Sequence, residues 1–302
     1  MENFLLHWYV LCGKIRKFIQ NRGIVMSDTT TSGGLRFLED RWDDTVAATL
    51  DPADTLRYRS NLLGSGLRMT NIGGSNTSSK LDQLDSIDGT TRTILWVKGP
   101  AGELASTVRS DFATLYLDKL HTIESRHTRT AKELPLADLY PLVTFGNNPT
   151  AAPIDTVLHA FLPFPHVDHL HPQWAMILAA SPDRKIKMEE FNSEFGHELA
   201  WLPWHSQGFE RARMLRDIVN KTPSCDGVLL AGQGLFTWGD TQRACHLSTL
   251  TIIDHLGQFF EWHAELEQYL ERYGLRKDGQ SFGKDIPSCP NEAMAGGEAF
   301  DG

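Results

Sequence analysis

The chain has few cysteines and no two of them in a C-x-x-C spacing. Its four cysteines lie far apart in 302 residues, at Cys12, Cys225, Cys245 and Cys289. A disulfide-rich scaffold and a thiolate zinc knuckle both need closely spaced thiols, so both are excluded. The sequence therefore predicts a protein of a reducing compartment, with the cytoplasm as the default.

Positive charge is also in short supply. Lys and Arg together number 29 against 38 Asp and Glu, which gives a formal net charge of −9. Such a chain has no overall positive field to collect phosphate backbones, so we expect no generic nucleic-acid binding. The hydrophobic content of 41% is enough for a full-sized core.

No apolar run is long enough to cross a bilayer. Residues 4–12 are apolar, but they reach only about half of the ~20 residues that a spanning helix needs. Basic residues follow this run instead of preceding it, so a secretory signal is not expected. A short interfacial helix is one interpretation of the segment. The other is an extension without a role, since Met26 opens an ordinary polar start.

Composition divides the chain into three parts. Residues 1–34 are expected to be a disordered or dispensable extension, and residues 277–302, which contain many glycines and prolines, a flexible tail. Between them, residues 35–276 alternate helical and strand patterns without a linker or a repeat. This alternation predicts an α/β fold, organised as a single three-layer α/β/α domain.

Hydrophobic spacing predicts the elements of this domain. Residues 35–68 read as two helices, the second opened by Asp51 as its cap and Pro52 at its first position. The glycine- and serine-rich residues 73–79 read as a loop. Further helices are expected at residues 155–162, 172–180, 208–220 and 241–272, and strands at residues 93–97, 167–170, 198–204 and 228–230.

Four histidines crowd into a short stretch, at positions 159, 166, 169 and 171. Alternate residues of a strand point to one face, so His169 and His171 could meet one metal ion. Asp155 lies four residues before His159 on a predicted helix and shares its face, which makes the carboxylate a candidate ligand or acid/base group. The alternative is a set of surface histidines or of core histidines with satisfied hydrogen bonds.

Three segments, residues 154–159, 166–172 and 234–240, resemble the class II aldolase/adducin family. The motifs H-x-H-P and G-L-F-x-W-G carry most of this likeness. Within the family the chain is most similar to the aldolase portion of bifunctional rhamnulose-1-phosphate aldolase/alcohol dehydrogenases, over roughly residues 35–272. The dehydrogenase portion would begin where this chain ends, and no G-x-G-x-x-G opens a helix, so nicotinamide chemistry is not expected.

The resemblance implies a divalent metal, usually zinc, held by three histidines near an acidic residue. His169 and His171 match two of the ligands, and Asp155 stands where the family has its acid/base Glu. The third ligand falls on Gln233, whose neutral amide is a poorer zinc ligand than imidazole. Three outcomes stay open: a working site with unusual ligands, a site completed by His159 or His166, or an inactive relative.

The resemblance also implies a phosphate-binding region. The family's phosphate loop falls on Gly74, Ser75, Asn76 and Ser78, and a second phosphate-side turn on Lys98 and Gly99. Backbone N–H groups and small hydroxyl side chains suit this task, because they approach an anion closely. A flexible turn and a solvated strand-end lysine are the alternatives.

The implied function is that of a zinc-dependent or other divalent-metal aldolase. It would cleave a phosphorylated ketose of the rhamnulose 1-phosphate type to dihydroxyacetone phosphate and lactaldehyde, without nucleic-acid or membrane partners. The resemblance implies a homotetramer, and the apolar residues 241–272 with Trp238 and Trp262 beside them suggest surface for it. An adducin-like binding module is the main alternative. A zinc hydrolase is less favoured, because no H-E-x-x-H is present.

Overall fold

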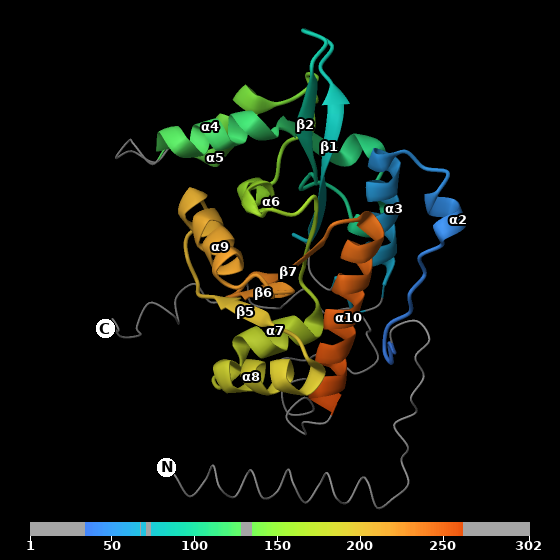
Figure 1. Cartoon of the computed structure of the whole chain (residues 1–302), viewed down its shortest axis with the longest axis vertical. Coiled ribbons are helices and arrows are strands. Elements are labelled where there is room, and N and C mark those ends of the chain that lie inside the picture. The colour runs from blue at the N-terminus through green and yellow to red at the C-terminus, as the bar shows by residue number, and fades with distance from the viewer. Residues whose placement is uncertain (1–33, 67, 71–73, 128–134, 262–302) are drawn as a thin grey trace, which may run out of the picture. The chain divides into compact units, whose positions relative to one another are not determined.

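The computed structural model describes residues 34–66, 68–70, 74–127 and 135–261 (Figure 1). The expected tail, residues 277–302, and all but Gly34 of the expected extension lie outside the described residues. Cys12, Cys289 and Trp262 also lie outside them. Of the helices in the described part, none is both long and apolar enough to cross a membrane.

One mixed sheet organises the described residues. Its seven strands follow the order β3-β2-β1-β4-β7-β6-β5, and only β5 and β6 pair in parallel. The strands are β1 (Asn76–Leu84), β2 (Thr91–Lys98), β3 (Phe112–Tyr116), β4 (His166–Leu170), β5 (Leu199–Leu202), β6 (Gly227–Leu230) and β7 (Gly234–Gly239).

Helices cover both faces of the sheet (Figure 1). One face carries α3 (Pro52–Ser65), α7 (Gln173–Ala180), α8 (Arg184–Phe195) and α10 (Gln242–Glu261). The other carries α4 (Leu117–His127), α5 (Leu136–Leu139), α6 (Thr156–Phe161) and α9 (Phe209–Lys221). Short turns of helix complete the fold: α2 (Asp44–Ala47), η1 (Leu104–Ser106), η2 (Arg109–Asp111) and η3 (Tyr140–Val143). The predicted α/β class is confirmed, with a core on each side of the sheet.

The first predicted helix is wrong, whereas the second is right. Asp51 caps α3 by accepting a hydrogen bond from the Asp54 amide at 2.7 Å, with Pro52 at the first position. Between residue 34, where the described part begins, and α3, only α2 is helical. The N–H groups of residues 36–38 instead bond the buried carboxylate of Asp254 at 2.7–2.9 Å. These backbone N–H groups therefore have partners without the hydrogen bonds of a helix, and the segment is not helical.

The predicted loop at residues 73–79 is a strand from Asn76 onwards. Its sequence, Asn-Thr-Ser-Ser-Lys, lacks the apolar residues that mark a strand, but β1 pairs with β2 on one side and β4 on the other. Buried partners also satisfy its side chains; for example, Thr77 bonds Ser60 of α3 at 2.6 Å. Strands β3 and β7 were not predicted from the sequence either.

The long C-terminal helix is confirmed as far as Glu261, and residues 262–272 lie outside the described part. Trp238 does not supply spare surface for an interface. It is 7% exposed and stacks on Phe164 with 4.7 Å between ring centroids. It is therefore a core residue of β7.

A buried ion pair joins α3 to β4. The Arg59 Nε lies 3.1 Å from the Asp168 Oδ1, and both side chains are fully buried. The remaining guanidinium nitrogens of Arg59 donate to the Ser78 carbonyl and to the Gln242 side chain. On the other side, the Asp168 Oδ2 accepts a hydrogen bond from Thr249 of α10 at 2.8 Å. The elements α3, β1, β4 and α10 thus meet at Asp168, one residue before His169.

Candidate active site

The structure brings His169 and His171 together at the end of β4. Their ring centroids are 4.9 Å apart, as the alternation of side chains along a strand predicts. His169 is 1% exposed and stacks on Phe236 of the neighbouring strand, with 4.2 Å between centroids. This packing holds the imidazole ring in one orientation.

Asp155 lies beside this histidine pair. It is the residue before α6, not a residue of the helix itself, and its side chain makes no capping hydrogen bond. Its Oδ2 lies 3.6 Å from the Nδ1 of His169. The residue is 9% exposed, so its carboxyl group faces the site and not the solvent.

Gln233 lies in the tight turn between β6 and β7. Its backbone carbonyl accepts a hydrogen bond from the Nε2 of His169 at 2.6 Å. The turn passes very close to β4, because a Cβ on Gly234 would lie 2.3 Å from the Leu170 carbonyl oxygen and the φ angle there is +89°. Only glycine fits, and the close turn brings the Gln233 backbone against His169.

The hydrogen bond to Gln233 determines the tautomer of His169. A carbonyl only accepts, so the Nε2 carries the proton and the Nδ1 presents a lone pair toward Asp155. Burial lowers the pKa of His169 to about 4, so its ring is neutral at pH 7. Burial raises the pKa of Asp155, partly offset by Arg211 and His171. Two acceptors 3.6 Å apart favour a proton or a cation between them.

Arg211 is a site residue that sequence reasoning missed. It lies on α9 and is 2% exposed, and its Nη2 is 4.0 Å from the Asp155 Oδ1. The available signal was its spacing of four residues from Leu215, which places both on the buried face of α9. Because Arg is seldom buried without a strong partner, its place here is informative.

Four buried polar atoms of this cluster have no hydrogen-bond partner among the described residues: the Asp155 Oδ1, the His169 Nδ1, the Arg211 Nη2 and the Gln233 Oε1. They come from four separate segments of the chain: the residue before α6, β4, α9 and the turn between β6 and β7. Leaving such atoms unsatisfied costs free energy, and native proteins rarely do so without a ligand, water or function. The cluster is therefore the candidate active site.

The other two histidines of the crowded stretch bond to β1. The Nε2 of His159 donates to the Asn76 Oδ1 at 2.5 Å, and its Nδ1 accepts from the Ser78 hydroxyl at 2.8 Å. The Nδ1 of His166 lies 2.9 Å from the Ser79 hydroxyl. Both ring nitrogens of His159 are thus used, which does not favour it as the missing metal ligand.

The predicted phosphate residues divide into two groups. Gly74 and Ser75 lie at the site: a Cβ on Gly74 would be 3.1 Å from the His171 ring, and the Ser75 hydroxyl accepts from the His171 amide at 3.3 Å. Asn76 and Ser78 instead turn their side chains to His159.

Lys98 and Gly99 form part of a local turn after β2. Lys98 is 1% exposed, and its ammonium group donates to the carbonyls of Gly99 at 3.0 Å and Ala101 at 2.5 Å. The structure thus describes a lysine that closes its own turn. Phosphate binding by this pair, and by the β1 residues, stays a prediction.

The donor set fits a divalent ion incompletely. Two imidazoles, an amide oxygen and a carboxylate are groups that zinc accepts, and His169, Gln233 and Asp155 each have an unpartnered buried atom. Within the described residues, however, no three His, Cys, Asp or Glu side chains gather into a group that could hold a metal ion. The site therefore offers a metal two imidazoles and the weaker oxygen of Gln233.

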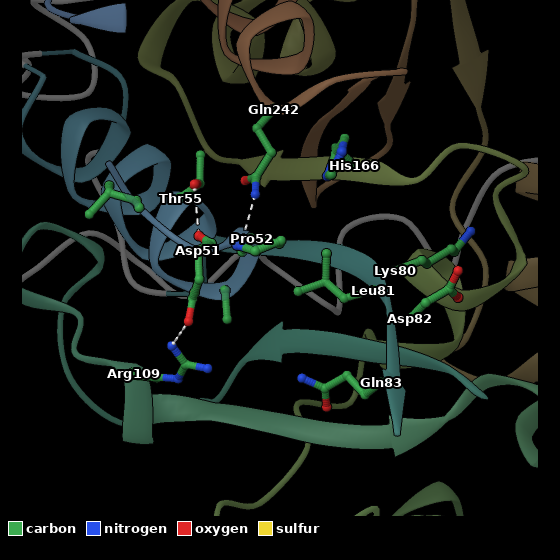
Figure 2. Close-up of a pocket in the computed structure, with 12 residues that line it drawn as sticks. Asp51, Pro52, Thr55, Lys80, Leu81, Asp82, Gln83, Arg109, His166 and Gln242 are labelled. Carbon is green, nitrogen blue, oxygen red and sulfur yellow. Dashed lines mark hydrogen bonds and ion pairs between the residues drawn. The ribbon is translucent and has the colours of Figure 1, made fainter. Parts of the chain in front are cut away.

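A pocket of about 590 Å³ lies elsewhere, between the start of α3, β1 and the start of η2 (Figure 2). Its wall includes Arg109, which is ion-paired with Asp51 at 2.6 Å, and Gln242, which donates to the Pro52 carbonyl. None of the four unpartnered atoms belongs to a residue of this wall. The pocket and the unpartnered polar atoms therefore lie in different parts of the fold, and the buried polar cluster remains the candidate active site.

Comparison with known proteins agrees with this fold. Residues 65–253 match the model of the Class II Aldolase and Adducin N-terminal domain. An uncharacterized oxidoreductase of Bacillus subtilis, YuxG, is 33% identical over 219 residues, which are 72% of this chain and 31% of that protein. The chain thus spans about a third of the length of this relative.

Two solved structures share the fold at lower identity. The N-terminal class II aldolase domain of a Thermoplasma acidophilum protein has a TM-score of 0.61 at 23% identity, covering 74% of this chain and 98% of that one. A sugar-phosphate aldolase from Thermotoga maritima has a TM-score of 0.51 at 10% identity, covering 69% and 94%. With the family model matched across the sheet and the histidine cluster, this chain belongs to the class II aldolase and adducin family.

Proposed function

We propose that the protein is a metal-dependent aldolase that cleaves a ketose 1-phosphate of the rhamnulose 1-phosphate type. The products would be dihydroxyacetone phosphate and lactaldehyde. The observation that carries this proposal is the set of unpartnered polar atoms on Asp155, His169, Arg211 and Gln233, gathered in the interior of a class II aldolase fold.

The reaction needs one group to accept a proton and others to orient the sugar. Asp155 is the proton acceptor, because its carboxylate is buried within the cluster and its Oδ1 accepts no hydrogen bond from the described residues. Asp155 takes the proton of the C4 hydroxyl, the C3–C4 bond breaks, and the electron pair of that bond passes into an enediolate over C2 and C3. Protonation of the enediolate at C3 then gives dihydroxyacetone phosphate. A divalent ion held by His169, His171 and Gln233 would supply Lewis-acid stabilisation of that charge.

The rest of the site orients the substrate. Gly74 and Ser75 lie beside His171, where backbone N–H groups can receive an anionic oxygen. Holding the phosphate there would place the C3–C4 bond beside Asp155, and such positioning supplies much of the acceleration in a cleavage reaction.

A direct assay tests the proposal. Purified full-length protein should release dihydroxyacetone phosphate and lactaldehyde from rhamnulose 1-phosphate, with a rate that falls on addition of EDTA and returns with zinc. Activity that ignores the chelator would contradict a metal mechanism. No cleavage of any ketose 1-phosphate, with or without zinc, would favour the alternative below.

A binding module related to adducin is the second candidate. It is favoured by Gln233 and by the absence, within the described residues, of three His, Cys, Asp or Glu side chains grouped for a metal ion. In that case the cluster would bind a polar ligand or no ligand, and the protein would not cleave a ketose phosphate.

Restoring the third imidazole separates these candidates. Gln233→His should raise zinc affinity at least tenfold, about 1.4 kcal/mol, because imidazole is a stronger ligand than a neutral amide. Retro-aldol activity should rise with it if the site is a weakened aldolase centre. Zinc affinity comes from competition with a chromophoric chelator. An unchanged affinity would show that Gln233 does not face the metal site, whereas tighter zinc without turnover would favour the module.

The proposed assembly is a homotetramer, as the resemblance implies. Several large apolar side chains of the described residues are exposed, including Leu84 at 67%, Leu142 at 72% and Ile87 at 87%. A neighbouring copy could cover such residues. Light scattering should report about four times the chain mass of 33.9 kDa. A mass of one chain would refute the assembly.

A further inference from the structure

Arg211 is a buried cation that the proposed steps above do not use. Its side chain is 3% exposed, and within the described part of the chain its one ion-pair partner is Asp155, at 4.0 Å from the Nη2 to the Oδ1. That separation is too long for a hydrogen bond. Burial without good pairing is unfavourable for a guanidinium, and it lowers the pKa of Arg211 below its usual value. If the pair served stability alone, we would expect the guanidinium and the carboxylate to lie within hydrogen-bond distance of each other.

The gap has the size of one oxygen atom. An oxygen equidistant from the Arg211 Nη2 and the Asp155 Oδ1 could lie about 2.8 Å from both atoms, which is an ordinary hydrogen-bond distance. Arginine only donates and a carboxylate only accepts, so the gap fits an oxygen that both accepts and donates, such as water in the free protein or a substrate hydroxyl in its place. Both facing atoms lack a partner in the described part of the chain.

The two residues come from elements that pack together. Asp155 precedes α6 and Arg211 lies in the first turn of α9, and the two helices lie side by side on one face of the sheet (Figure 1). The α9 backbone therefore holds the guanidinium beside the carboxylate. The gap is built by two rigid elements and not by a surface side chain.

We propose that Arg211 binds the same substrate oxygen from which Asp155 removes the proton. This inference rests on the proposed aldolase function and adds a residue that the family likeness did not assign. The oxygen is the C4 hydroxyl of the ketose phosphate, which becomes the carbonyl oxygen of the aldehyde product.

The step balances with Arg211 as a donor only. Asp155 takes the hydroxyl proton, the oxygen lone pair forms the new C=O bond, and the electrons of the C3–C4 bond move to the enediolate. Negative charge develops on the oxygen before the bond breaks. Arg211 stabilises it through an N–H donor that stays protonated, and a fixed donor in a water-poor site acts most strongly on charge that develops in the transition state.

Arg211→Gln tests this role, with Arg213→Gln as the matched control. Arg213 lies on the same helix but pairs with Glu210 at 2.7 Å, away from Asp155. With rhamnulose 1-phosphate as substrate, we expect kcat of Arg211→Gln to fall about 10²-fold, the usual cost of one transition-state donor, with a much smaller change in KM. The control should keep parental kinetics. Thermal unfolding of Arg211→Gln should match or exceed that of the parent, because a poorly paired buried charge is removed.

Two further readouts distinguish contact from structural support. Guanidinium ion added at millimolar concentration should restore part of the kcat of Arg211→Ala and should not affect the control. By calorimetry, the parent should bind 4-deoxy-rhamnulose 1-phosphate at least tenfold more weakly than rhamnulose 1-phosphate, while Arg211→Gln should bind the two alike.

The outcomes separate the two proposals. If the parent cleaves the substrate and Arg211→Gln keeps its kcat within twofold, the role of Arg211 is overturned while the aldolase function stands. A lowered melting temperature, no guanidinium rescue and an equal preference for the 4-hydroxyl in both proteins would also overturn it, by showing structural support. A parent that neither binds nor cleaves the ketose phosphate would overturn both.

Discussion

Asp155→Asn is expected to lower the turnover of rhamnulose 1-phosphate by 10²- to about 10⁴-fold, the usual contribution of a general acid/base group. The amide keeps the size of the carboxyl group but cannot accept the C4 proton. The loss should appear in kcat, because the phosphate and the histidine pair remain in place. Steady-state rates of dihydroxyacetone phosphate release, measured at saturating zinc, give the comparison.

Asp183→Asn is a matched control. Asp183 also precedes a helix, α8, and its side chain likewise makes no capping hydrogen bond, but it is not among the unpartnered atoms of the cluster. This variant should keep parental turnover. Full activity of Asp155→Asn would remove the carboxylate from the mechanism and would leave proton transfer to another group.

Asp168→Ala is expected to lower the free energy of unfolding by about 3–5 kcal/mol, the cost of leaving one member of a buried ion pair without its partner. Arg59 would keep its charge at 0% exposure, and Thr249 and Cys245 would lose the carboxylate oxygen to which they donate. Such a loss is a large part of the usual stability of a domain. Urea unfolding followed by tryptophan fluorescence measures it.

An exposed pair provides the contrast. Glu210→Ala removes an ion pair between neighbouring turns of α9, in which the Glu210 side chain is 55% exposed, and should change stability far less. Replacing both partners, in Arg59→Met with Asp168→Leu, should recover much of the loss, because no buried charge is then left alone. A loss below about 1 kcal/mol for Asp168→Ala would show that the pair contributes little.

The part of the site that the sequence predicted depends on local spacing. His169 and His171 are two residues apart at the end of β4, where the alternation of side chains places both imidazoles on one side. The start of α3 was equally readable, because Asp51 and Pro52 act within their own helix. Asp155 was recognised by its position in the family motif, although it precedes α6 and does not lie within it.

The part that the sequence did not predict depends on distant partners. The strand β1 carries polar residues, whose burial depends on hydrogen-bond partners from other elements. Ser60 of α3 bonds Thr77, and His159 of α6 bonds Ser78. In the sequence, Arg211 is one of several charged residues of an amphipathic helix, and only the packing of α6 against α9 shows that it is buried. Its approach to Asp155, 56 positions earlier in the sequence, cannot be read from either segment.

By itself, the sequence determined the α/β class, the capped start of α3 and the pairing of His169 with His171, since each follows from interactions between residues near one another along the chain. Only the tertiary structure decided which polar groups are satisfied. It bonded His159 to Asn76 and Ser78, turned Lys98 onto its own loop, and left Asp155 and Arg211 facing each other across a gap of 4.0 Å. The reason is that burial and hydrogen bonding depend on which elements pack together, and residues far apart along the chain determine that packing.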